Sequence, residues 1–282
     1  MREISLGEYY FEIALLLRQT MFLSTALLNS ETWLGLTKTN IEELEKIDQS
    51  LLKRIFEAPV TTSIKSLYLE SGCYPVRFQI KARRIMFLHY LLNRKEDELI
   101  SKIFWAQKEQ PTKNDWYSTV MQDLKEFSLY FLDLSEIKNM KKDVFKKTVK
   151  EKCKEISLKY LLEDNDQKSK LKNLKYYQLQ LQPYLMSKKI TTRQKKLLFR
   201  FRTIMVKVGH NYGKRTKCPL CKLKDDTQEH LFQCVVLKLN CSELYNAQDE
   251  KNQDIFSMNQ DTVIKVAKIC ESIVRKREEI LS

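Results

Sequence analysis

Residues 39–59, TNIEELEKIDQSLLKRIFEAP, show the clearest helical periodicity in the chain. Thr39 followed by Glu42 predicts a capping box at the start of a helix, and Pro59 predicts its end. Apolar side chains recur between them at steps of three and four residues, and charged side chains fill the opposite face. The apolar positions are Ile41, Leu44, Ile47, Leu51, Leu52 and Ile55. The stretch therefore predicts an amphipathic helix that packs one face on a hydrophobic core.

Helical patterns of the same kind occur on both sides of this stretch. Only five glycines and five prolines occur in 282 residues. A chain so poor in helix breakers is typical of a mainly α fold and not of a β-sandwich or barrel. Pro75 opens one helix, and Pro111 separates two others. Further helices are expected over residues 7–29, 64–69, 75–92, 97–107, 113–127, 191–208 and 260–281.

The composition excludes several classes of protein. Apolar residues make up 43% of the chain and aromatic residues 10%, which is enough for a core and excludes disorder as a description of the whole. The segment after Met1 lacks the pattern of a secretory signal. The longest apolar stretch, 13–28, is interrupted by Arg18 and Gln19 and is shorter than the roughly 20 residues of a spanning helix. We therefore expect an intracellular protein, in the nucleus or the cytoplasm, with no membrane partner.

Positive charge is concentrated in one segment. The chain has 50 Lys and Arg residues against 36 Asp and Glu, and residues 167–224 contain 17 of the cations and no acidic residue. This window therefore carries the whole positive excess of +14. An acid-free segment interleaved with aromatic residues indicates a face that binds RNA, DNA or both. A solvated surface and an acidic protein partner are the alternatives.

Two groups of side chains are candidates for contact with nucleic acid. The helix expected over residues 191–208 has apolar residues on one side and several cations on another. Phosphate contacts are expected from Lys195, Lys196, Arg200, Arg202, Lys207, Lys214 and Arg215, and base or sugar stacking from Tyr176, Tyr177 and Tyr212. His210 lies among them and is expected to be a surface-loop residue, with a phosphate contact as the alternative.

The strongest local motif is a set of four metal-ligand residues. Cys218, Cys221, His230 and Cys234 follow the spacing C-x2-C-x8-H-x3-C. Two thiolates on a tight turn, with a histidine and a cysteine four residues apart on a helical turn, complete a tetrahedron and leave no open position. The motif predicts one structural Zn²⁺ ion in a CCHC zinc knuckle. Packed, reduced thiols around a core histidine are the alternative, and Cys241 is a minor competitor of Cys234.

The remaining cysteines and histidine are expected to be structural. Cys73, Cys153 and Cys270 have no ligand partners in the sequence and are expected to be buried thiols. His89 lies on the apolar side of the helix that Pro75 opens, so we expect it in the core.

No catalytic motif is present. The five glycines form neither a phosphate-binding loop nor a nucleophile elbow. The only Asp-Asp pair, Asp225-Asp226, lies inside the presumed zinc loop and is expected to be loop. We therefore expect that the chain is not an enzyme on its own.

Several segments, in order, resemble the region after the catalytic palm in reverse transcriptases of non-LTR (LINE-type) retrotransposons. They are residues 27–33 (LLNSETW), 36–38 (LTK), 44–46 (LEK), 51–55 (LLKRI), 199–202 (FRFR) and the cysteine-histidine motif with Thr227, Glu229 and Leu231. In that family the first four belong to the thumb, and the last resembles the C-terminal zinc knuckle. The resemblance implies a region that grips template RNA and target DNA.

The departures from the family pattern limit what the resemblance implies. Asn29 replaces the family's Tyr-Gly type of entry, and no Tyr-x-Asp-Asp motif is present, so no DNA synthesis is expected. Only 48 residues follow Cys234, too few for the endonuclease of some members. The expectation is a non-catalytic C-terminal fragment or remnant. The alternatives are a thumb subunit that works in trans with a palm domain and a protein-interaction module.

The predicted architecture is a multi-helix bundle followed by a basic helical segment and a small CCHC zinc knuckle. The expected parts are a thumb-like helical domain over residues 1–130, a basic helical linker region over 131–208, the zinc knuckle over 209–240, and a C-terminal helix over 241–282.

Overall fold

The computed structural model describes residues 7–163, 176, 178–213, 216–240 and 259–282. Within these ranges every regular element is a helix, and one isolated β-bridge joins Lys217 and Asp225. The predicted mainly α fold is therefore confirmed. Among the helices in these ranges, none is both long and apolar enough to cross a membrane.

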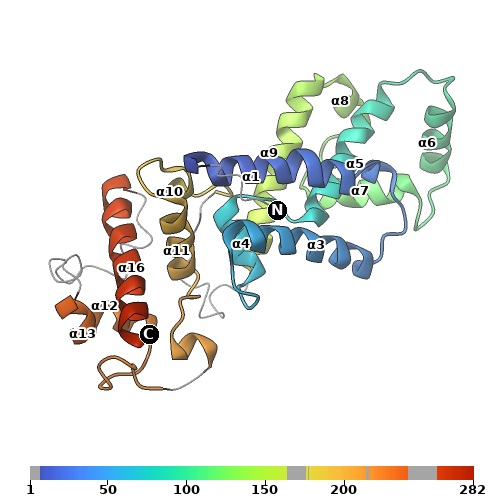
Figure 1. The fold of residues 1–282 in the computed structure, drawn as a ribbon. Helices are drawn as coiled ribbons and strands as arrows, with labels where there is room; N and C mark the ends of the chain where they lie inside the picture. Colours follow the sequence, from blue (N-terminus) through green and yellow to red (C-terminus); the bar gives the residue numbers. More distant parts are fainter. Residues whose placement is uncertain (1–6, 164–175, 177, 214–215, 241–258) are drawn as a thin grey trace.

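The N-terminal elements form two neighbouring rows of helix (Figure 1). They are η1 (Gly7–Tyr9), α1 (Tyr10–Leu17), the π-helical η2 (Arg18–Phe22), α2 (Leu23–Ala26), η3 (Ser30–Thr32), α3 (Lys38–Phe56) and α4 (Ile64–Ser71). Arg18, which interrupts the apolar stretch, is buried and donates two hydrogen bonds of 2.6 and 2.7 Å to Asp48 of α3. The Tyr68 hydroxyl donates to the same carboxylate at 2.8 Å. The buried charge is thus compensated across α1–η2, α3 and α4.

The predicted capping box of α3 is wrong by two residues. Thr37 is the N-cap: its hydroxyl accepts from the Asn40 N–H at 3.2 Å, and the Asn40 side chain accepts from the Thr37 N–H at 3.0 Å. An asparagine thus occupies the position at which Glu or Gln is more usual. The helix ends at Glu57, whose φ of 47° takes the chain out of the helix before Pro59.

Five helices form a lobe around a core of their own, at the right of Figure 1. They are α5 (Val76–Leu92), α6 (Leu99–Glu109), α7 (Trp116–Glu126), α8 (Leu134–Asn139) and α9 (Lys142–Leu162). His89 is buried there, with Nε2 2.9 Å from the Met140 carbonyl, as expected of a core histidine.

The helical region expected over residues 131–208 contains α9, but the sequence pattern did not show the bounds of this helix, although it is 21 residues long. Its buried stripe is one residue wide and recurs every four residues: Phe145, Val149, Cys153, Ser157 and Leu161. Lysines surround this stripe, and two of its five members are Cys and Ser, so the apolar periodicity is weak.

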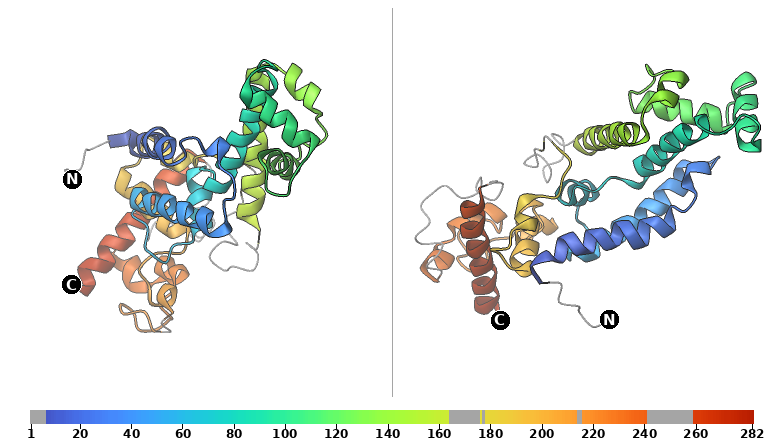
Figure 2. Two further views of the ribbon diagram at one scale, coloured as in Figure 1. Left: turned by 90° about the vertical axis from the view of Figure 1, so that its right-hand side faces the viewer. Right: turned by 90° about the horizontal axis from the view of Figure 1, so that it is seen from above.

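The remaining helices form the opposite lobe. They are α10 (Pro183–Met186), α11 (Thr192–Arg202), η4 (Gly209–Tyr212), α12 (Gln228–Gln233), α13 (Val235–Asn240) and α16 (Gln260–Leu281). The last agrees with the helix predicted over residues 260–281. The expected helix over 191–208 is shorter, because Ile204 with φ 54° ends it and Met205 N–H bonds back to the Arg200 carbonyl at 2.7 Å. From above, the two lobes lie end to end (Figure 2).

A single hydrophobic core connects the N-terminal helices with the C-terminal lobe. Ring centroids lie 5.0 Å apart for Phe11 and Phe56, 4.5 Å for Phe56 and Phe199, and 5.5 Å for Phe201 and Phe232. This core runs across the predicted boundaries at residues 130/131 and 208/209. The segment expected to form a separate zinc knuckle therefore shares its core with α1 and α3.

Gly72 marks a close crossing of two backbone segments. A Cβ atom added there would lie 2.2 Å from the Gln180 carbonyl carbon, and φ is +68°. Beside this crossing, the Gln182 N–H donates to the Glu70 carbonyl at 3.1 Å. Only glycine satisfies both the left-handed backbone and the close approach.

Candidate metal centre

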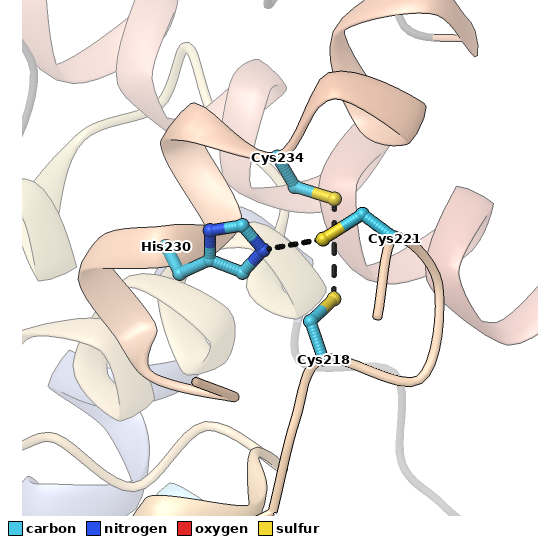
Figure 3. Close-up of side chains that lie close together, drawn as sticks. All are labelled: Cys218, Cys221, His230 and Cys234. Atoms are coloured by element: carbon cyan, nitrogen blue, oxygen red, sulfur yellow. Dashed lines mark hydrogen bonds between the residues drawn. The ribbon is translucent and has the colours of Figure 1, made fainter. Parts of the chain in front are cut away.

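The first two candidate ligands lie on a short hairpin. The Cys218 N–H donates to the Lys224 carbonyl at 2.7 Å, and the Asp226 N–H donates to the Thr216 carbonyl at 2.9 Å. Lys222 closes the turn with φ 58°, and its N–H donates to the Cys218 carbonyl at 2.8 Å. The turn brings the Cys218 and Cys221 side chains to the same side (Figure 3).

The other two ligands come from α12 and its C-terminal end. Thr227 is the N-cap, and its hydroxyl accepts from the His230 N–H at 3.1 Å. Leu231 and Phe232 are buried in the shared core. This anchoring orients His230 and Cys234 toward the hairpin.

The four side chains converge on one point. The Cys218 and Cys234 Sγ atoms are 3.9 Å apart, and Cys221 Sγ lies 3.2 Å from His230 Nε2. All four ligand atoms lie within 4.8 Å of one another. Metal bonds of about 2.3 Å to sulfur and 2.0–2.1 Å to nitrogen give tetrahedral edges of roughly 3.6–3.8 Å, which these separations approach. The predicted residues thus form a cluster that can hold one metal ion.

The protonation of the thiols differs within the cluster. Burial raises the pKa of Cys234 to about 11. Burial also opposes ionisation of Cys221, but hydrogen bonds from the Leu223 and Lys224 N–H groups, and one with His230, lower its pKa to about 6. A metal ion would therefore bind a ready thiolate at Cys221 and displace a proton from Cys234.

Asp226 fixes the hairpin to the rest of the lobe. Its Oδ2 atom accepts from the Gly209 N–H at 2.6 Å and from Arg277 Nη2 of α16 at 2.8 Å. The sequence prediction treated Asp225 and Asp226 alike, as loop residues. Asp225 is exposed and pairs with Lys217, whereas Asp226 is buried. No local signal distinguishes the two, because the partner of Asp226 lies 51 residues away.

Three of the predicted contacts with nucleic acid are wrong, because the side chains of Lys195, Arg202 and Tyr176 are buried. Lys195 is buried and donates to the Glu8 carbonyl at 2.8 Å. Arg202 is buried against the Glu70 carboxylate at 2.9 Å, and the Tyr176 hydroxyl donates to that same carboxylate. These side chains lie in the protein interior, where Arg202 compensates the charge of Glu70. In these positions they cannot contact a ligand on the surface.

Other cations of the window have acidic neighbours from outside it. Lys196 pairs with Glu57 at 2.5 Å and lies 4.5 Å above the Tyr10 ring, and Arg200 donates to the Glu57 carbonyl at 3.0 Å. Arg193 lies 3.8 Å from Glu271. Residues 167–224 thus contain no acidic residue, but acidic residues from other segments lie beside their cations. These residues come from the C-terminal end of α3, from α4 and from α16.

Lys207 remains exposed as predicted, and so do Lys222 and Lys224 on the metal-binding hairpin. None of the three has an ion-pair partner among the described residues. Tyr177, Lys214, Arg215 and Cys241, and the side chains of His210 and Tyr212, lie outside the described part of the chain.

Comparisons with protein-family models, with curated proteins and with solved structures find no match to this chain. The resemblance to retrotransposon reverse transcriptases therefore rests only on the residues quoted above.

Proposed function

We propose that the chain is a helical nucleic-acid-binding protein in which Cys218, Cys221, His230 and Cys234 bind one structural zinc ion. The observation that carries the proposal is the convergence of these four side chains within 4.8 Å. A set of three thiolate sulfurs and one imidazole nitrogen is a common tetrahedral ligand set of structural zinc. Four protein ligands leave no position for a substrate, so the metal orders the fold and takes no part in catalysis.

The nucleic-acid part of the proposal is supported by charge. The chain carries a net charge of +14. Lys222 and Lys224 lie on the hairpin that the metal would order, and Lys207 lies just after α11. Exposed cations without an ion-pair partner among the described residues are the groups that exchange counterions for phosphates, which gives sequence-tolerant binding. In the terms of the family resemblance, the ligand is template RNA or target DNA, held without DNA synthesis.

A second candidate function, assembly with another polypeptide, is favoured by one specific observation. The N-terminal helices expose large apolar side chains: Leu16 is 60% exposed, Met21 66% and Leu28 65%. Apolar residues gathered on one segment are typical of a protein contact. The resemblance names a reverse transcriptase palm domain as the partner of a thumb that works in trans.

Two measurements test the proposal. Elemental analysis of the purified chain is expected to give one zinc per molecule. Fluorescence anisotropy with a labelled 20-nucleotide RNA, and with a DNA duplex, is expected to show log K falling linearly with log salt. Three to five phosphate contacts give a slope of about −3 to −5 on the duplex, at about −0.9 per contact. Binding that barely changes with salt would remove nucleic acid from the proposal and favour the protein partner.

A further inference from the structure

A cavity of about 440 Å³ lies where α11, the turn that follows it, α12 and α16 meet. Apolar side chains line part of it, and they include Val206, Leu231 and Val274. Leu231 follows the metal-cluster residue His230 directly, so the cavity adjoins the candidate metal centre. Its volume is within the 300–1,000 Å³ range of small-molecule sites.

Three cations also line the cavity. Arg200, Lys207 and Arg277 line it, against one acidic side chain, Glu278. Arg200 is held by the Glu57 carbonyl and Arg277 by Asp226. One further nitrogen of each guanidinium group, Arg200 Nε and Arg277 Nη1, is buried and has no hydrogen-bond partner among the described residues. Neither atom has surface open to the cavity, so an anion bound there is attracted by the charges of Lys207 and the two arginines and forms no hydrogen bond with these two nitrogens.

We propose that this cavity binds one unpaired nucleotide of a single-stranded nucleic acid. The base packs against the apolar side chains of the cavity, and the phosphate meets the exposed Lys207, with the charges of Arg200 and Arg277 beside it. The space admits a single base with its sugar but not a stacked base pair, so a nucleotide must leave its helix to enter. Apolar side chains do not hydrogen-bond with base edges, which makes the site tolerant of sequence.

This inference rests on the proposed nucleic-acid-binding function and names the place at which a single strand would be held. The test uses the zinc-loaded full chain, a labelled 12-nucleotide single strand and the corresponding duplex. Lys207→Gln is compared with Lys268→Gln, which removes the same charge from an exposed position of α16 that does not line the cavity. Lys207→Gln is expected to weaken single-strand binding about tenfold, and Lys268→Gln less than twofold. On the duplex the two variants are expected to behave alike.

A second variant, Val274→Trp, fills the cavity from α16. The probe is a single strand with 2-aminopurine in place of one base, whose fluorescence rises when that base leaves its stack. The wild-type protein is expected to raise the fluorescence, and Val274→Trp is expected not to. Circular dichroism melting checks that the variant folds. If it does not fold, the two lysine variants decide alone.

The outcomes separate the inference from the function on which it rests. Salt-dependent binding of single strand and duplex that Lys207→Gln and Lys268→Gln weaken equally would overturn the nucleotide site and leave the proposed function standing. Absence of binding to either probe by the wild-type protein would overturn both.

Discussion

Asp226 on the metal-binding hairpin and Arg277 on α16 form an ion pair of 2.8 Å whose side chains are only 5% and 11% exposed. The same carboxylate accepts the Gly209 N–H. This one residue therefore joins three segments: the hairpin, the turn that begins η4, and the C-terminal helix.

Asp226→Asn is expected to lower the free energy of unfolding by about 3 kcal/mol, because it leaves the Arg277 charge buried without its partner. The neighbouring pair provides the control. Asp225 is 69% exposed and pairs with Lys217 at the surface, so Asp225→Asn is expected to cost less than about 1 kcal/mol. Chemical denaturation of both variants measures the difference, and equal effects would contradict the role given to Asp226.

Cys218→Ser is expected to abolish stoichiometric zinc binding and to lower the melting temperature, and a chelator is expected to do the same to the wild-type protein. Since the knuckle segment shares a core with α1, α3 and α11, the loss is expected to spread through the C-terminal lobe and not to remain within residues 209–240. Cys153→Ala, in the core of the other lobe, is the control: it costs packing energy but leaves the zinc content at one. Full zinc content in Cys218→Ser would contradict the ligand assignment.

Gly72→Ala is expected to destabilise the protein by roughly 3 kcal/mol or more, since its Cβ would clash with the backbone of Gln180. Gly35 is a matched control because its φ of +66° is almost the same and a Cβ atom there has nothing within 4 Å. Gly35→Ala carries only the cost of the left-handed backbone, about 1 kcal/mol. Thermal melting of the two variants separates the clash from the backbone strain.

Burial raises the pKa of Asp123 to about 6, although Arg84 lies 3.3 Å away and opposes the shift. A carboxyl group whose pKa is higher in the folded than in the unfolded state stabilises the fold at low pH. It loses that contribution as pH rises from about 4 to about 6. Relative to wild type, Asp123→Asn is therefore expected to become more stable over this range, by about 2 kcal/mol. A stability difference that stays constant from pH 4 to pH 7 would contradict the shifted pKa.

The features of this fold that could be predicted are those that depend on residues close together in the sequence. The helix over residues 260–281 and the four clustered metal ligands could be identified because regular spacing alone determines their proximity. The start of α3 was misplaced because Asn40 occupies the position expected for Glu or Gln. Whether a cation is a surface contact or an interior ion pair depends on partners far along the chain, such as Glu70 for Arg202, 132 residues away. Sequence periodicity contains no information on such pairs.

Aromatic contacts link Phe11 to Phe56 and Phe56 to Phe199, and Phe232 packs against Phe201. The chain therefore has no domain boundary near residue 208. A stop codon or a protease cut there would strip Phe201 of its cover and expose core rings to water, each worth about 1.5–3 kcal/mol when buried. The C-terminal part of the chain thus covers a hydrophobic core to which the N-terminal helices also contribute. A gene fragment that encodes either part alone therefore encodes only some of the side chains that form this core.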